Sequence, residues 1–398
     1  MPAADGARAG PALAGRRLWF VGIGGAGLSA YARLARAWGA EVGGWDRVRT
    51  PYLDGLDGIE LALAPEPVVP AGWEVVVSAA YPGVPGRPRA AFLAELVALR
   101  SSIVVAGTHG KGTVAAMIAF VLRETGRDPA WLVGAPVPQL GANGGAGDGW
   151  LVVEGDESDR TVFGLPAAIA VVTNVELDHH SEFASLAELE SEFARWADRA
   201  AHVVRDAAVY DGELTLPGDH NRRNAGTALA ALELAGVARD EAAPVLAVFA
   251  GTGRRFETSE AGGVAIVDDY GHHPTEITAT IAAARERFPG RRLRVLFQPH
   301  LYSRTRHLAR ELGTALAAAD DVAVTDVYAA REEPVAGVTG KLVVDALSDR
   351  GRLAAWTPTL ESAVDHVARA ARPGDVVLVI GAGDVDRVPA LLRERLAR

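Results

Sequence analysis

The stretch Ala106-Gly107-Thr108-His109-Gly110-Lys111-Gly112-Thr113 decides how the rest of the chain is interpreted. It lies between the apolar run Ile103–Ala106 and a stretch from Val114 to Thr125 that has apolar residues at helical spacing. At such a junction, backbone amides surround the phosphates of a nucleotide, a lysine neutralises them and a hydroxyl binds Mg²⁺. The spacing differs from the general phosphate-binding loop, because its first glycine is missing and Gly112 separates the lysine from the threonine. The sequence favours a nucleotide-binding loop over a glycine-rich turn with a solvated lysine.

Short apolar runs recur along the chain, each followed by a helical pattern such as Thr305–Ala319. The runs are Leu18–Gly22, Ile103–Gly107, Leu151–Glu154, Ile169–Asn174, Val264–Asp269, Leu293–Pro299, Val322–Val327 and Val376–Gly381. Runs of this length are typical of buried parallel strands, and strands that alternate with helices are typical of α/β proteins. We therefore expect an α/β fold with parallel sheets.

Length and composition set further bounds. The 398 residues exceed one ordinary core and predict two or three domains, with boundaries near Leu99–Ser102 and Ala247–Thr252. The lack of cysteine excludes disulfides and thiolate metal sites, and a net charge of −10 argues against nucleic acid as the main partner. The N-terminus lacks a secretory signal, and no apolar run approaches the roughly 20 residues that span a bilayer. We expect a cytoplasmic protein without membrane insertion.

A second glycine-rich loop, Gly22-Ile-Gly24-Gly25-Ala26-Gly27, follows the first apolar run and opens a helical pattern. Its glycines permit a tight turn, and a helix N-terminus offers unpaired amides to a diphosphate. The loop favours nucleotide binding over a plain strand–helix turn, but it does not distinguish a nicotinamide cofactor from a UDP-sugar. Asp46, after the next strand-like run, is either a strand-end cap or a ligand contact.

Polar clusters follow two other apolar runs. Glu154-Gly-Asp156-Glu157-Ser-Asp159 places carboxylates where a metal could bridge phosphates, although a solvated acidic strand end is the alternative. Thr173-Asn-Val-Glu-Leu-Asp-His-His180 closes the next run, and a histidine there is either a ligand or a satisfied polar residue.

Taken together, these motifs resemble the Mur ligase family. The resembling segments follow the family order across nearly the whole chain, and they are Phe20–Ser29, Ala106–Thr113, Glu154–Asp159, Thr173–His179, Gly218–Asn224, Gly253–Glu257, Asp268–Glu276, Phe297–Arg306, Asp326–Pro334 and Gly381–Asp384. The most specific are Asp-Asp-Tyr-Gly-His-His-Pro at 268–274 and Phe-Gln-Pro-His at 297–300, which resemble the alanine-adding branch of the family.

The resemblance implies three domains and an ATP-dependent ligase reaction. A Rossmann-like domain at 1–99 would bind the UDP-sugar, a P-loop ATPase domain at 100–248 would bind ATP, and a Rossmann-like domain at 249–398 would bind the amino acid. ATP, with Mg²⁺, would convert a carboxylate to an acyl phosphate, which the amine of the amino acid would attack. For the alanine-adding branch the substrates are UDP-N-acetylmuramate and L-alanine, in peptidoglycan precursor synthesis.

The resemblance also implies roles for individual residues. ATP would contact Gly107, Thr108, Gly110, Lys111, Thr113, Asn224, Arg255 and Asp269. The UDP-sugar would contact Gly22, Gly24, Gly25, Gly27 and Asp46. The amino acid would contact Tyr270, His272, His300 and Arg304. The metal ligands would be Thr113, Glu154 and His179, and the catalytic residues Lys111, Glu154, His179, His272 and His300. One of these histidines would be the general base for the attacking amine.

Four features depart from the family pattern. Gly112 stands where the alanine-adding enzymes have threonine, and Leu301 stands where they have an arginine that recognises the amino acid. The stretch from His179 to Gly218 and the stretch between Tyr81 and Leu96 are shorter than in the family. These departures keep two alternatives open, namely a related ligase with another amino acid or UDP-sugar and a catalytically silent nucleotide-binding paralogue.

Overall fold

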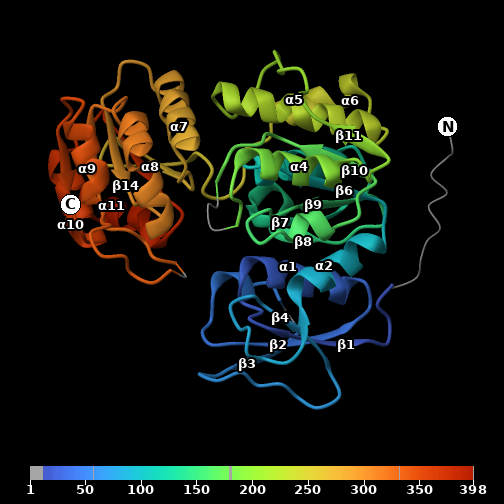
Figure 1. The fold of residues 1–398 in the computed structure, drawn as a ribbon. Coiled ribbons are helices and arrows are strands. Elements are labelled where there is room, and N and C mark those ends of the chain that lie inside the picture. The colour runs from blue at the N-terminus through green and yellow to red at the C-terminus, as the bar shows by residue number, and fades with distance from the viewer. Residues whose placement is uncertain (1–11, 57, 179–181, 331, 398) are drawn as a thin grey trace. The chain divides into compact units, whose positions relative to one another are not determined.

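The computed structural model describes residues 12–56, 58–178, 182–330 and 332–397 (Figure 1). These residues form three separate sheets, which confirms the predicted α/β class. Each of the predicted strands is present, and the two stretches predicted to be helical form α3 (Lys111–Glu124) and α8 (Tyr302–Leu316). No helix in the described ranges is long and apolar enough to cross a membrane.

The first sheet is parallel throughout and has the order β3-β2-β1-β4-β5. Its strands are β1 (Arg17–Val21), β2 (Glu41–Asp46), β3 (Glu60–Leu63), β4 (Glu74–Val77) and β5 (Arg87–Pro88). Helix α1 (Ala26–Ala37) connects β1 to β2, and α2 (Arg89–Ala98) follows β5. The strand order reverses between β1 and β4, which is where open parallel sheets bind ligands. The Gly22–Gly27 loop begins at this point, because it follows β1 directly.

The second sheet has the order β11-β10-β6-β9-β7-β8 and is parallel except for the antiparallel pair β7–β8. Its strands are β6 (Ser102–Ala106), β7 (Ala130–Val137), β8 (Ala142–Gly145), β9 (Leu151–Glu154), β10 (Ile169–Val172) and β11 (His202–Val204). Its helices are α3, α4 (Leu186–Ala197), α5 (Asp219–Leu234) and α6 (Arg239–Ala247). Every residue of β6 is buried, as expected for a central strand covered on both faces. The nucleotide-binding loop predicted from sequence joins β6 to α3.

The third sheet has the order β12-β13-β17-β14-β15-β16, in which only β12–β13 is antiparallel. Its strands are β12 (Glu257–Ala261), β13 (Val264–Asp269), β14 (Leu293–Phe297), β15 (Asp321–Val324), β16 (Ala354–Trp356) and β17 (Val376–Ile380). Its helices are α7 (Pro274–Arg287), α8, α9 (Lys341–Ser348), α10 (Leu360–Ala370) and α11 (Val388–Leu396).

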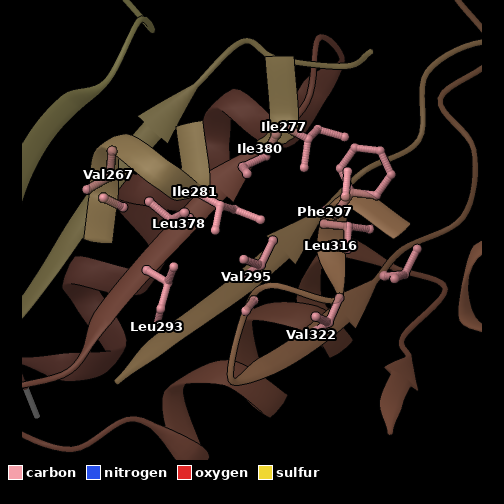
Figure 2. Packing of buried hydrophobic residues seen from close by; sticks show 14 of the residues in the cluster. Val267, Ile277, Ile281, Leu293, Val295, Phe297, Leu316, Val322, Leu378 and Ile380 are labelled. Carbon is pink, nitrogen blue, oxygen red and sulfur yellow. The ribbon is translucent and has the colours of Figure 1, made fainter. Parts of the chain in front are cut away.

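Both faces of the third sheet are buried, because alternate residues of each strand enter different cores. Figure 2 shows Val295 and Phe297 of β14 in one core with Ile277 and Ile281 of α7. Leu296, between them in the strand, belongs to a second core with residues of α10 and α11. This two-sided burial explains why β17 is a continuous apolar run and why β13 and β14 are apolar apart from Asp268, Asp269 and Arg294.

The chain divides into two compact units. The first comprises Met1–Glu176, Ala187–Glu213 and Arg223–Ala250, and the second comprises Leu177–Leu186, Leu214–Arg222 and Gly251–Arg398. The first unit therefore contains two of the three sheets. The predicted boundaries at 99 and 248 fall between α2 and β6 and between α6 and β12. The division into three domains at those residues stays a prediction.

Candidate active site

The β6–α3 loop is fixed by the segment that follows β10. The carbonyl of His109 accepts hydrogen bonds from Thr173 Oγ1 at 2.7 Å and Asn174 Nδ2 at 2.8 Å, and its amide donates to Asn174 Oδ1 at 2.9 Å. Gly107 has φ +124°, and a side chain there would collide with Thr173. Gly110, at the start of α3, has φ +79° and lies against Asn224. The loop therefore has a defined shape that these glycines make possible.

Lys111 forms an ion pair with a buried carboxylate. Its Nζ lies 2.8 Å from Glu157 Oε2 and donates hydrogen bonds to Glu157 Oε1 at 3.1 Å and to the Thr108 carbonyl at 3.2 Å. Glu157 is 2% exposed. Burial lowers the pKa of Lys111, but the charges of Glu157 and Asp156 outweigh it, so that the pKa lies above its usual value. Lys111 is therefore a cation at neutral pH, as phosphate binding requires.

Glu154 lies beside the first turn of α3. Its Oε2 accepts a hydrogen bond from the Gly134 amide at 2.6 Å. A side chain at Gly112 would place its Cβ 3.1 Å from Glu154 Oε2, so glycine permits this close approach. Thr113 is 7% exposed, and its hydroxyl makes no hydrogen bond to the described part of the chain. A carboxylate and an uncommitted hydroxyl at the start of this helix are hard oxygen donors that fit Mg²⁺.

The Gly22–Gly27 loop is held by Asp46 at the end of β2. Asp46 Oδ2 accepts from the Gly24 amide and Oδ1 accepts from the Arg47 amide, both at 2.7 Å. Thr50 Oγ1 donates to the Gly24 carbonyl at 2.6 Å. No side chain caps α1, whose N-cap residue is Gly25. Of the two interpretations left open for Asp46, the structure gives it the contacts of a residue that shapes the loop, and those contacts use both of its oxygens.

In the second unit, a compact cluster contains the residues predicted to contact the amino acid. Arg304 is 3% exposed and binds Asp178 through one edge of its guanidinium, Nε to Oδ1 at 3.0 Å and Nη2 to Oδ2 at 2.9 Å. Its Nη1 lies 3.0 Å from His300 Nδ1. The His272 ring lies 5.8 Å from the His300 ring and 5.7 Å from the Tyr270 ring, between centroids. The structure therefore brings all four predicted residues together.

Burial lowers the pKa of His272 to about 3, although Glu276 and Asp178 act in the opposite direction. His272 is thus neutral at physiological pH. Its Nδ1 lies 3.1 Å from the Tyr270 carbonyl, which only the Nδ1–H tautomer can bond. Its Nε2 then carries the lone pair, and this atom lies 4.0 Å from Asp178 Oδ2.

The residues predicted to contact ATP from the second unit lie around Tyr270. The guanidinium groups of Arg254 and Arg255 lie 5.3 Å and 5.2 Å from the Tyr270 ring centroid. Asp269 is 7% exposed, and it accepts hydrogen bonds from the Phe256 and Gly271 amides at 3.0 Å and 2.8 Å. Burial raises the pKa of Asp269 despite the charge of Arg255. Asp269 therefore has a role in shaping this loop, and its contact with ATP stays a prediction.

Sequence reasoning missed several partners of the predicted residues. His179, predicted as a catalytic residue and metal ligand, lies outside the described residues. In the sequence, Glu157 and Asp178 are members of polar runs at strand ends. The sequence does not predict that Glu157 pairs with Lys111 or that Asp178 pairs with Arg304. Tyr328 stacks on His300 with centroids 5.8 Å apart; it lies in the family-like segment Asp326–Pro334, but the resemblance gave it no role.

Comparison with known proteins gives the family. Residues 254–383 match the family model described as Mur ligase, glutamate ligase domain. The UDP-N-acetylmuramate--L-alanine ligase of Paenarthrobacter aurescens is 36% identical, covering 96% of this chain and 97% of the relative. The corresponding ligase of Thermobifida fusca is 37% identical and covers 96% of each. The chain belongs to the Mur ligase family.

Solved structures agree with this membership. The UDP-N-acetylmuramate-alanine ligase of Thermotoga maritima has a TM-score of 0.77 at 25% identity, covering 95% of this chain and 98% of that one. A murein peptide ligase of Psychrobacter arcticus shares the fold, with a TM-score of 0.65 at 22% identity over 96% of this chain and 99% of that one. The chain is thus an enzyme with the three-domain Mur ligase fold, of the ATP-dependent ligase class.

The alignment with the Paenarthrobacter relative extends over 447 positions, more than the 398 residues of this chain. The relative therefore has residues that this Mur ligase lacks. That the missing residues fall in the two stretches expected from sequence stays a prediction.

Proposed function

We propose that this Mur ligase joins L-alanine to the carboxylate of UDP-N-acetylmuramate in peptidoglycan precursor synthesis. ATP phosphorylates the carboxylate and leaves as ADP, and the amine of L-alanine then displaces phosphate from the acyl phosphate. The observation that carries this proposal is the match to ligases of that name over 96% of the chain. The cationic loop of the first unit and the histidine cluster of the second supply the chemistry that such a reaction needs.

The first requirement is to bring two anions together, the ATP γ-phosphate and the substrate carboxylate. Lys111 is a buried cation on a fixed loop, so its charge offsets that repulsion without a large reorganisation of the side chain. Thr113 and Glu154 would hold Mg²⁺, which supplies charge neutralisation and orientation of the phosphates when bound. His179 would contribute a further ligand by family resemblance.

The second requirement is to remove a proton from the attacking amine. We assign this role to Nε2 of His272, because the Tyr270 carbonyl accepts from Nδ1–H and leaves the lone pair on Nε2. Asp178 lies where it can stabilise the imidazolium that forms. His300 instead accepts a hydrogen bond at Nδ1 from Arg304, which leaves its hydrogen on Nε2 and favours a positioning role.

The test is phosphate release from ATP with Mg²⁺ and UDP-N-acetylmuramate, against a panel of single amino acids. Release that depends on both UDP-N-acetylmuramate and L-alanine supports the proposal. If ATP binds but no amino acid stimulates turnover, the assignment of this substrate pair is wrong, and a silent paralogue becomes the better account.

One observation favours a second candidate, a ligase for another amino acid. Leu301 cannot pair with a carboxylate, and the guanidinium of Arg304 is already engaged by Asp178 at its Nε–Nη2 edge and by His300 at Nη1. The charge available to an amino-acid carboxylate is therefore smaller than in the family pattern. Stimulation by a different amino acid, with none by L-alanine, would establish this alternative.

A further inference from the structure

The turn that leads into β12 contains two strained residues, one on each side of Arg255. Arg254 has φ +56° and Phe256 has φ +55°. Residues with a side chain rarely adopt such a positive φ, and they keep it only where the surrounding contacts enforce it. Arg255 is predicted to contact ATP, whereas the family resemblance gave neither neighbour a role. Because the backbone turns at both neighbours, their conformations set the direction of the Arg255 side chain.

Asp268, near the end of β13, holds the side chain of Arg254. Its Oδ2 accepts from Arg254 Nε at 3.1 Å, and its Oδ1 lies 3.4 Å from Arg254 Nη2. Nη2 also donates to the Gly381 carbonyl at 2.7 Å. Asp268 is 8% exposed, so little water competes for these contacts. The guanidinium of Arg254 is therefore fixed to the ends of two neighbouring strands, β13 and β17.

Backbone contacts hold the same turn against the end of β13. The Arg254 carbonyl accepts from the Tyr270 amide at 2.7 Å. The Phe256 amide donates to Asp269 Oδ2 at 3.0 Å. Between these two anchored residues, the guanidinium of Arg255 lies 5.2 Å from the Tyr270 ring centroid. The side-chain fork and the backbone contacts together enforce the two strained conformations.

We propose that Asp268 is a positioning residue for the nucleotide, which fixes Arg254 and thereby keeps the turn that directs Arg255 toward ATP. The inference rests on the proposed function, because it takes Arg255 as an ATP contact. It goes beyond that function by giving Asp268 and Arg254 a part in the affinity for ATP. Asp268 acts through its neighbours and does not touch the nucleotide, whose charge a second carboxylate would repel.

The first test is the kinetics of Asp268→Asn in the phosphate-release assay with UDP-N-acetylmuramate and L-alanine. We expect the KM for ATP to increase about fivefold, less than the tenfold or more for direct loss of a charge-assisted hydrogen bond. The kcat and the KM for UDP-N-acetylmuramate should stay within twofold of the wild type, because only nucleotide binding is altered. If Asp268→Asn does not fold, Arg254→Lys tests the same fork, since it keeps the charge and loses the fork geometry.

The second test asks whether Asp268 acts through Arg255. Arg255→Gln should raise the KM for ATP by a larger factor than Asp268→Asn, because it removes the contact itself. The double variant should have the KM of Arg255→Gln alone, since a turn without the arginine has nothing left to direct. Two independent effects would instead multiply.

The ion pair of Arg294 and Asp375 provides a matched control in the same unit. Arg294 Nε lies 2.8 Å from Asp375 Oδ2, and both side chains are 10% exposed, against 11% for that of Asp268. This pair lies at the other end of the third sheet, where β14 and β17 begin. Asp375→Asn makes the same chemical change as Asp268→Asn and should leave the KM for ATP unchanged.

The proposal is overturned if Asp268→Asn and Asp375→Asn change the KM for ATP equally, because Asp268 would then only stabilise the fold. It is also overturned if the effects of Asp268→Asn and Arg255→Gln multiply, or if Arg255→Gln leaves the KM for ATP unchanged. Absence of turnover in the wild type would instead contradict the proposed substrate pair. The same comparisons, made on the Kd for a non-hydrolysable ATP analogue, would then decide the role of Asp268.

Discussion

At the scale of single residues, Lys111 and Glu157 each depend on the other's charge. Removing one member of a buried ion pair leaves an uncompensated charge, which costs about 3–5 kcal/mol. We expect Glu157→Gln to lower the free energy of unfolding by about 3 kcal/mol without nucleotide and by much less with a saturating non-hydrolysable ATP analogue. The phosphates of the analogue would supply the missing negative charge. Urea unfolding with and without the analogue measures both values.

The double variant Lys111→Met/Glu157→Gln is the control for this prediction. It removes both charges and should be less destabilised than Glu157→Gln alone. If the analogue stabilises Glu157→Gln no more than the wild type, Lys111 does not exchange Glu157 for phosphate.

His272 gives the protein a predictable response to acid. Burial lowers its pKa to about 3 in the folded chain, against 6.5 for a solvent-exposed histidine without charged neighbours. Between these values the unfolded chain binds a proton that the folded chain does not, so the free energy of unfolding decreases as pH falls below about 6.5. At pH 5 the contribution of His272 is at most about 2 kcal/mol. We expect His272→Gln to lose less stability than the wild type between pH 7 and pH 5, measured by urea unfolding.

The stability of the wild type must be compared with that of His272→Gln, because other groups also titrate between pH 7 and pH 5. Burial raises the pKa of Asp268 to about 6, so its contribution has the opposite sign and decreases as pH rises. His202, which is exposed in β11, provides the control through His202→Gln. An equal loss of stability in the wild type and in His272→Gln would show that His272 is not held neutral by the fold.

The same residues show how far sequence reasoning reaches at this scale. The acidic run at 154–159 is recognisable because carboxylates follow an apolar strand. Its division among α3, Lys111 and Arg89 is not, since the direction of each side chain depends on a turn of three residues and on partners far away in sequence. For the same reason Arg304 could be placed near the histidines but not on Asp178, from which 126 positions separate it.

At the scale of elements, α1 packs on the β7–β8 hairpin through small residues. A Cβ on Gly144 would lie 2.8 Å from Ala30 Cβ, closer than atoms tolerate without a shift. Asn143 Nδ2 donates to the Ala26 carbonyl at 2.6 Å beside this contact. We expect Gly144→Ala to destabilise the protein by about 1–3 kcal/mol through overpacking, measured by urea unfolding.

Gly164→Ala is the matched control, because nothing lies within 4 Å of its would-be Cβ, and it should change stability little. Ala30→Gly in the Gly144→Ala background should recover part of the loss by restoring the space. An unchanged unfolding midpoint for Gly144→Ala would mean that the helix and hairpin can separate at little cost.

This packing also explains which strands the sequence could not predict. The predicted strands are apolar runs with neighbours on both sides, such as β6 and β14. Strand β7 contains Pro136, and β8 has the sequence Ala-Asn-Gly-Gly, so neither has the composition of a strand. Gly144 lies directly against Ala30 of α1, and that contact is not visible from the local sequence.

At the scale of the whole molecule, the structure has three sheets in two compact units. The expected boundaries precede new strand patterns, and the division into three domains that the resemblance implies stays a prediction. The compact units follow packing, and they join the first two sheets because α1 contacts both β2 and the β7–β8 hairpin. The segments 177–186 and 214–222 belong with the third sheet, since residues such as Asp178 bond to it. The sequence does not show to which compact unit such short segments belong, because their composition is that of a loop.

The two units also predict where a ligand stabilises the protein. The Gly22–Gly27 loop, predicted to contact the UDP-sugar, lies in the first unit, so UDP at 100 times its Kd should add about 2.7 kcal/mol to the stability of that unit. Seven of the eight tryptophans lie there and Trp356 alone in the second, so thermal unfolding followed by tryptophan fluorescence in a Trp356→Phe variant reports the first unit. Hydrogen exchange of β17, whose five residues are all buried, reports the second. We expect UDP to raise the fluorescence transition and to leave the exchange of β17 unchanged. Equal protection of both would show that the two units unfold as one cooperative body, and the free energy of UDP binding would then be shared by the whole chain.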